Sequence, residues 1–443
     1  MLNFEKLKNR VNNANPLHFR GLVTEIIGLT IQSRGPRAGV GELVYIQSKQ
    51  GVIPAEVVGF KSERTLLMPL GDLAGVAPGD LVTAVNQPFK VKVGPEIIGR
   101  VLDGLGRPLD NKGALKWESE YPLLESPPHP LKRKRITENL SLGIKVIDGL
   151  LTCGKGQRLG IFSGSGVGKS TLLGMIARNS SADVNVIALI GERGREVREF
   201  LENDLKAGID RSVVVVASSD QPAIVRVKAA FLATALAEYF RDQGKDVILL
   251  MDSITRFAMA QREIGLAVGE PPATKGYTPS VFALLPRLLE RAGTDVQGSI
   301  TGLYTVLVEG DDFNEPISDA VRGILDGHLI LSRALASLGH YPAVDVLNSI
   351  SRVMLNIVDS EHQVAATKIK KLLAIYSEAK DLIDVGAYQK GSNLQIDLAI
   401  CFIEQINQFL QQEIQEAFKS EQTIQILKDL YQEIIRKERD INV

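Results

Sequence analysis

The stretch Gly160-Ile161-Phe162-Ser163-Gly164-Ser165-Gly166-Val167-Gly168-Lys169-Ser170-Thr171 decides the fold of this chain. An apolar run ends at Phe162, three glycines lie between residues 163 and 168, and an apolar helical pattern follows. A phosphate-binding loop requires this order of strand, loop and helix. Glycines let successive backbone N–H groups surround phosphate oxygens, and the helix N-terminus adds positive potential. We therefore predict that residues 163–171 bind a nucleotide through its phosphates.

Two side chains of this loop supply a positive charge and a metal ligand. Lys169 is placed to reach the β- and γ-phosphates, and the hydroxyl of Ser170 is placed to ligate Mg²⁺. The strict motif begins with glycine where this chain has Ser163, but Gly168 and the two residues after it agree with the motif. The alternative is an ordinary glycine-rich turn with a chance Lys-Ser pair. The strand before the loop and the helix after it favour the phosphate-binding interpretation.

The composition indicates a globular protein of two to four domains. The chain has 443 residues and a net charge of -1, so no global field attracts it to nucleic acid or membrane. Its two cysteines, Cys153 and Cys401, are too few for a disulfide framework and indicate a reducing compartment. The N-terminus has no signal-peptide pattern, and no apolar run approaches the roughly 20 residues of a membrane span. We expect a cytoplasmic protein.

The sequence pattern changes along the chain and predicts four segments. Residues 1–20 form an arm, in which residues 1–15 read equally as a short amphipathic helix for association and as a frayed terminus. Residues 21–90 hold short β-rich runs, which indicate a small barrel or sandwich. Residues 91–345 alternate strands with helices, which predicts an α/β domain with a parallel sheet covered on both faces. Residues 346–443 form a helical domain, with helices expected from Asn348 onward.

The strands expected in the sheet follow from apolar runs of four to nine residues. They lie at residues 159–162, 184–190, 213–217, 247–251, 300–308 and 328–331. Ligands of such sheets bind at the carboxyl ends of the strands, and the loop 163–170 is in that place. Between residues 22 and 85, only Tyr45 and Phe60 stand out as aromatic residues, and the basic run 132–135 reads as a solvated segment. We therefore expect no nucleic-acid partner.

Three residues outside the loop are candidates for the chemistry. Asp252 ends the apolar run 247–251, as in the Walker B arrangement that holds Mg²⁺ through water, although an aspartate capping the next helix would look the same. Glu192 follows the predicted strand 184–190, where it could polarise an attacking water or cap a helix. Arg352 could be a surface arginine or a finger inserted into a neighbour's site. The phosphate loop favours the metal role of Asp252, and spacing alone leaves Glu192 and Arg352 open.

A family resemblance covers residues 98–397. The matching runs are residues 147–158, 191–196, 252–258, 269–277, 325–333, 339–345 and 386–391. With these runs the chain resembles the catalytic subunits of rotary-type ATPases. The last run and residues 311–317 make it similar to the ATPases of type III protein export, and the loop from Ser165 to Gly168 looks flagellar. The resemblance implies a small N-terminal β-barrel, a central RecA-like P-loop domain and a C-terminal helical domain, assembled as a homohexameric ring that hydrolyses ATP with Mg²⁺.

The resemblance also implies roles for single residues. Glu192 matches the catalytic carboxylate, and non-catalytic subunits of the rotary synthases carry Gln at that position. Lys169 matches the phosphate lysine and Asp252 the Walker B acid.

Four further matches follow from the resemblance. Arg193 matches a secondary catalytic residue and Glu196 a secondary residue beside the metal. Tyr341 matches the aromatic residue that packs on adenine. Arg352 matches the finger donated across the subunit interface, so identical copies could complete each other's sites.

The same resemblance implies partners and a place in the cell. We expect a stator-like regulatory protein, export-gate membrane proteins, and the chaperones and cargo of the flagellar apparatus, with the ring peripheral to the membrane and docked at the cytoplasmic face of the export apparatus. The alternatives are a virulence (injectisome) secretion ATPase, a hexameric RNA translocase, for which residues 22–85 lack a dense stacking surface, and a nucleotide-binding scaffold without catalysis.

Overall fold

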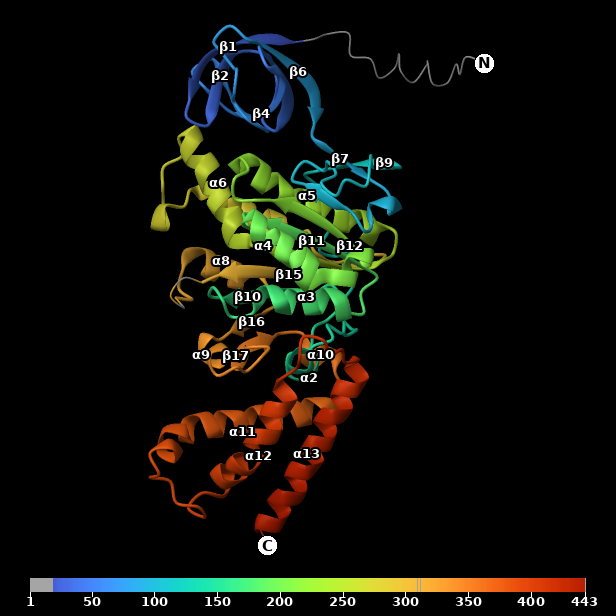
Figure 1. The fold of residues 1–443 in the computed structure, drawn as a ribbon, viewed down its shortest axis with the longest axis vertical. Coiled ribbons are helices and arrows are strands. Elements are labelled where there is room, and N and C mark those ends of the chain that lie inside the picture. The colour runs from blue at the N-terminus through green and yellow to red at the C-terminus, as the bar shows by residue number, and fades with distance from the viewer. Residues whose placement is uncertain (1–18, 309, 311, 443) are drawn as a thin grey trace, which may run out of the picture.

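The structure, a computed structural model, describes residues 19–308, 310 and 312–442. Residues 1–15, which read equally as a short helix and as a frayed terminus, lie outside these described residues. Figure 1 shows three bodies along the longest axis of the molecule: a blue barrel at one end, a central sheet domain in green and yellow, and long orange and red helices at the other end. The predicted fold class is confirmed.

The N-terminal body is a closed barrel in the order β1-β2-β5-β4-β3-β6. Its strands are β1 (Arg20–Ile27), β2 (Thr30–Arg34), β3 (Glu42–Ser48), β4 (Gly51–Lys61), β5 (Arg64–Pro69) and β6 (Leu81–Pro88). Alternate residues such as Val44 and Ile46 are fully buried, as expected when one face of each strand lines the barrel interior. The sequence pattern did not predict β2, whose residues are mostly polar but are buried between β1 and β5.

The central body is a nine-stranded sheet in the order β17-β16-β10-β15-β13-β11-β12-β8, with β14 paired to β15. Its strands are β8 (Val101–Asp103), β10 (Arg158–Ser163), β11 (Val184–Ile190), β12 (Ser212–Ala217), β13 (Asp246–Asp252), β14 (Gly293–Thr294), β15 (Ser299–Leu307), β16 (Gly327–Leu331) and β17 (Val344–Ser351). All ladders are parallel except β14 with β15 and β16 with β17. Beside this sheet, β7 (Lys90–Val93) pairs with β9 (Ser119–Pro122).

Helices cover both faces of the sheet and create two apolar cores. On β11, Val186, Ala188 and Ile190 belong to one core, and Ile187 and Leu189 belong to the other. This alternation explains why the strand reads as a continuous apolar run in the sequence. The helices of the sheet domain are α2 (Lys145–Leu150), α3 (Lys169–Asn179), α4 (Gly194–Glu199), α5 (Ala223–Asp242), α6 (Ile254–Val268), α7 (Pro279–Leu289), α8 (Pro316–Ile324) and α9 (Arg333–Ser337), with shorter turns η1 (Pro95–Ile97), η2 (Phe200–Leu205), η3 (Lys206–Arg211) and η4 (Thr274–Gly276).

The expectation of helix from Asn348 onward was wrong for the first residues. Strand β17 continues through Ser351 and pairs antiparallel with β16 at the edge of the sheet. It alternates buried and exposed side chains, so its pattern was weaker than that of the buried parallel strands. The boundaries proposed for the four segments stay predictions, and β17 runs across the one placed after residue 345.

The C-terminal body consists of long helices. They are α11 (Ser360–Asp384), α12 (Leu394–Leu410) and α13 (Ser420–Asn442), preceded by the short α10 (Met354–Ile357). Leu398, Ile406, Leu427 and Ile434 of this body join the core that also contains α2 and α3, so the helical body packs directly on the sheet domain. Within the part of the chain that the structure describes, no helix is both long enough and apolar enough to cross a membrane.

Candidate nucleotide-binding site

The phosphate loop lies where the sequence placed it, between the end of β10 and the start of α3. Gly168 caps α3 with φ 86° and Gly166 has φ 76°, and both angles fall in the left-handed region that glycine adopts without strain. The Ser163 side chain is 1% exposed, and its hydroxyl has no hydrogen-bond partner in the described protein. The loop therefore presents backbone N–H groups, a helix N-terminus and an unsatisfied hydroxyl, a combination that suits an anionic ligand.

Lys169 lies among carboxylates from two neighbouring strands. Its Nζ atom is 2.5 Å from Oδ1 of Asp252 at the end of β13, and 3.8 Å from Oε1 of Glu192 just after β11. These side chains are only 6–16% exposed. The Thr305 hydroxyl of β15 donates a hydrogen bond of 2.7 Å to the same Asp252 oxygen and orients it. The parallel sheet thus brings together three candidates that are far apart in the sequence.

Glu192 has the titration behaviour expected of a general base. Burial, followed by the charge of Asp252, raises its pKa to about 7, although Lys169 opposes the shift. The two carboxyl groups of Glu192 and Glu196 share a hydrogen bond, and this bond lowers the pKa of Glu196. A base with a pKa near the working pH is both available in the unprotonated form and able to accept a proton.

Arg193 and Glu196 form the first turn of the helix that follows Glu192. The Arg193 backbone N–H donates to Glu196 Oε2 at 3.3 Å, which satisfies a free N–H group at the start of α4. The Arg193 guanidinium lies 3.6 Å from Glu196, and its side chain is 81% exposed. Arg193 is therefore held at its base by the backbone hydrogen bond while its charged end stays available to a ligand.

Tyr341 lies against the phosphate loop. A Cβ atom at Gly168 would be 3.3 Å from the Tyr341 ring, so the ring covers this glycine directly. The Tyr341 side chain is 44% exposed, which leaves a ring face for another flat group. The structure thus joins Tyr341 to the loop across more than 170 residues of sequence.

Arg352 lies at the opposite end of the strands from the phosphate loop, just after β17, the edge strand two positions from β10. Ser351 pairs with Gly327 at the start of β16, and the Arg352 N–H donates to the Asp326 carbonyl at 3.0 Å. The register with β10 places Arg352 about five residues, or roughly 16 Å, from Ser163 along the strands. The Arg352 side chain is exposed. No arginine side chain covers this distance, so the structure does not bring Arg352 to its own phosphate loop.

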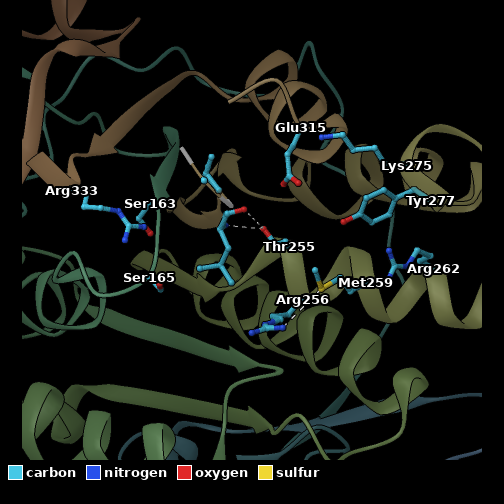
Figure 2. A pocket seen from close by; sticks show the side chains of 13 residues that line it. Ser163, Ser165, Thr255, Arg256, Met259, Arg262, Lys275, Tyr277, Glu315 and Arg333 are labelled. Atoms are coloured by element: carbon cyan, nitrogen blue, oxygen red, sulfur yellow. Dashed lines mark hydrogen bonds between the residues drawn. The ribbon is translucent and has the colours of Figure 1, made fainter. Parts of the chain in front are cut away.

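A pocket of about 440 Å³ opens beside the first residues of the loop. Figure 2 shows Ser163 and Ser165 on one side and Arg262, Lys275 and Tyr277 on the other. Sequence reasoning did not single out the basic residues of this pocket, which are Arg256, Arg262, Lys275 and Arg333.

Arg256 is a basic residue of the pocket whose side chain lies against the segment that carries Glu192. A Cβ atom at Gly191, next to Glu192, would be 2.9 Å from the Arg256 side chain. The Arg256 Nε atom is buried without a hydrogen-bond partner among the described residues. The position of Arg256 four residues after Asp252 was the sequence signal that could have identified it.

The residues at the loop fit a Mg²⁺-nucleotide. Ser170 is exposed on the first turn of α3, and Asp252 lies beside Lys169. Among residues 19–308, 310 and 312–442, no group of three or more His, Cys, Asp or Glu side chains could hold a metal by itself. Mg²⁺ is usually held by one or two protein ligands, substrate phosphates and water, and this donor set agrees with that mode.

Three family descriptions match successive parts of the chain. Residues 23–86 match the beta-barrel domain of the ATP synthase alpha/beta family, and residues 143–351 match the nucleotide-binding domain of that family. Residues 358–429 match the T3SS EscN ATPase C-terminal domain. The matches follow the three bodies of the structure in order.

Individual proteins match over nearly the whole chain. A flagellum-specific ATP synthase of Bacillus subtilis is 58% identical and covers 93% of this chain and 94% of its own length. A type 3 secretion system ATPase of Xanthomonas euvesicatoria is 51% identical over 92% of this chain and 93% of its own length.

Solved structures of one protein also match. The assembled ATPase EscN from the enteropathogenic E. coli type III secretion system has a TM-score of 0.88 at 48% identity, with 93% of this chain and 100% of EscN covered. A structure of assembled EscN with its central stalk EscO has a TM-score of 0.87 at 47% identity over the same shares.

Proposed function

The chain belongs to the ATP synthase alpha/beta family, and from this membership we propose that it hydrolyses ATP to energise the export of flagellar proteins. The observation that carries the proposal is the cluster of Lys169, Asp252 and Glu192 around the phosphate loop. A phosphate-binding cation, a metal-binding acid and a carboxyl group with a pKa of about 7 are the parts that phosphoryl transfer to water needs.

In the proposed mechanism, each residue of the cluster has one task. Glu192 accepts a proton from the water whose oxygen attacks the γ-phosphorus, while the bond from the γ-phosphorus to the β-phosphate oxygen breaks. Lys169 and Arg193 neutralise charge on the phosphates. Tyr341 packs on the adenine. Ser170 and Asp252 would hold Mg²⁺, with Glu196 close by, and the metal would supply Lewis-acid charge to the phosphate oxygens.

The proposed active form is a homohexameric ring with sites at the subunit interfaces. Arg352 is exposed and lies roughly 16 Å from its own loop along the strands. We therefore assign it the role of stabilising the transition state at the site of a neighbouring subunit. The match to assembled EscN supports self-association. The match to EscN with its central stalk EscO supports a regulatory partner of similar kind.

We place the ring in the cytoplasm, docked at the membrane export apparatus. The proposed partners there are a stator-like regulatory protein, export-gate membrane proteins, export chaperones and their cargo. A second candidate is a virulence secretion ATPase, favoured by the relative from Xanthomonas and by the EscN C-terminal domain match. Deleting the gene separates the two, because either hook and filament proteins or needle and effector proteins then fail to leave the cell.

The dependence of ATPase rate on protein concentration tests the assembled site. If each site needs Arg352 from a neighbour, the rate per subunit rises with concentration and levels off once rings form, as monitored by light scattering. The matched control is Arg352→Ala, which should assemble over the same range with no comparable rise in rate. A rate per subunit that stays constant down to concentrations at which light scattering detects only monomers would contradict the proposal.

A further inference from the structure

Gln412 links the C-terminal helical body to Tyr341, the residue that lies against the phosphate loop. It lies two residues after the end of α12 and is 5% exposed. Its backbone N–H donates a 2.9 Å hydrogen bond to the carbonyl of Tyr341. The Tyr341 ring covers Gly168. This hydrogen bond therefore connects the C-terminal body, through Tyr341, to the nucleotide loop.

The side chain of Gln412 is fully used in the same place. Its Oε1 atom accepts from the Lys145 N–H at 2.8 Å, and its Nε2 atom donates to the Gly143 carbonyl at 2.9 Å and to the Glu416 carbonyl at 3.1 Å. One N–H faces the amide oxygen and two carbonyls face the amide nitrogen, so only one orientation of the amide satisfies them. The side chain therefore holds the Gln412 backbone, and with it the Tyr341 carbonyl, in a fixed place.

The segments that Gln412 connects belong to different bodies. Gly143 precedes α2 and Lys145 is its first residue, and α2 packs against α11, α12 and α13. The His362 ring of α11 lies 2.7 Å from the Gly149 carbonyl of α2, and Phe409 of α12 lies against Gly149. A movement of the helical body relative to the sheet domain would therefore displace the Tyr341 segment through Gln412.

We propose that Gln412 is a positioning residue, which holds Tyr341 at the place where a nucleobase packs and so makes ATP affinity depend on the C-terminal body. This inference rests on the base-binding role given to Tyr341 under the proposed function. Gln412 has no part in the reacting phosphates. Its loss should weaken binding of the base and should leave binding of a phosphate chain unchanged.

The test compares dissociation constants for ATP and for inorganic tripolyphosphate, which lacks a base, in the full-length protein with Mg²⁺. A stacked base contributes a factor of about 5 to 150 in affinity, so Tyr341→Ala should raise the Kd for ATP within that range and leave tripolyphosphate unchanged. Gln412→Ala should raise the Kd for ATP about fivefold or more, again without an effect on tripolyphosphate. In turnover, KM should rise with little change in kcat, because binding to the base is equal in ground and transition states.

Two further variants sharpen the test. Gln412→Glu keeps the shape but presents a carboxylate to two carbonyls, so it should weaken ATP binding as Gln412→Ala does. The control is Gln411→Ala, an exposed neighbour, whose affinities should equal those of the wild type. In a Tyr341→Ala background, Gln412→Ala should add nothing, because both changes act on the same contact.

The outcomes separate the inference from the proposed function. If Tyr341→Ala binds ATP normally, the base site itself is misassigned. If Tyr341→Ala weakens ATP binding but neither Gln412 variant does, the inference fails and the proposed function stands. Gln412 variants that lose tripolyphosphate in step with ATP would also overturn it, since Gln412 would then support the fold rather than the position of Tyr341.

Discussion

The two ends of the parallel strands in the central sheet differ in how complete their chemistry is. At the carboxyl ends of the parallel strands, Lys169 lies within 4 Å of both Asp252 and Glu192, and all three side chains are largely buried. At the opposite, amino end of these strands, Arg352 is exposed, and its backbone N–H donates to the Asp326 carbonyl. One end is therefore organised within a single chain, whereas the other presents an exposed charge. Under the proposed function, that charge completes a site in a neighbouring copy, so that each copy would hold most of one site and a remaining part of another.

Lys169→Ala should give the largest effect, because it removes the only cation at the organised end of the strands within 4 Å of Glu192 among the described residues. In the proposed mechanism Lys169 neutralises phosphate charge in ground and transition states alike, so we expect hydrolysis to be lost and ATP binding to be weakened. Steady-state turnover and equilibrium binding measure the two effects. Lys245→Ala is the control, since Lys245 is exposed at the other end of β13. Turnover at the wild-type rate in Lys169→Ala would break the comparison.

Arg352→Ala tests the other end of the strands, where Arg352 lies. It should bind ATP and assemble normally, and it should lose about 10³- to 10⁵-fold in rate, as arginine fingers do in other phosphoryl-transfer enzymes. Glu192→Gln should also be nearly inactive. Rings that contain both variants should regain part of the activity, because an intact Glu192 site meets an intact Arg352 at some interfaces.

The control for this mixing experiment pairs two variants that are both defective at the organised end of the strands. Rings of Lys169→Ala with Glu192→Gln should regain nothing, because both residues of each site come from one chain. Rings of Arg352→Ala and Glu192→Gln that contain both variants and still stay inactive would show that Arg352 does not act on a neighbour. The two ends of the strands would then not be halves of one site.

The pH dependence of kcat/KM gives the smallest and most specific effect. The pKa of Glu192 is raised to about 7 by burial and by Asp252, so its carboxylate form is lost as pH falls through 7. We expect kcat/KM to be level above that pH and to fall about tenfold per unit below it. Glu192→Gln, slower by a factor on the order of 10² or more, should lose this dependence. ATP binding by that variant over the same pH range reports the titration of the phosphates alone. An unchanged pH profile in Glu192→Gln would mean that another group titrates.

The sequence by itself determined the elements whose signals are local. The phosphate loop, the strand 184–190 and the acid at the end of β13 were all predicted at their positions, since a buried parallel strand is a continuous apolar run and a loop motif is contiguous. The sequence also predicted the order of barrel, sheet domain and helical body, because each has its own periodicity of apolar residues. The polar strand β2 and the alternating strand β17 were missed, since their burial and pairing come from neighbouring strands rather than from their own residues.

Only the tertiary structure decided which distant residues meet. The contact of Tyr341 with Gly168, the Arg256 side chain against Gly191 and the bonds of Gln412 join segments that no spacing relates. The raised pKa of Glu192 likewise depends on its burial and then on the charge of Asp252, which lies close because β11 pairs with β13. Because β17 runs antiparallel to β16, Arg352 lies at the amino end of the parallel strands, away from the phosphate loop. Strand order and register are set by packing over the whole chain, and therefore local sequence could name Arg352 as a candidate but could not place it.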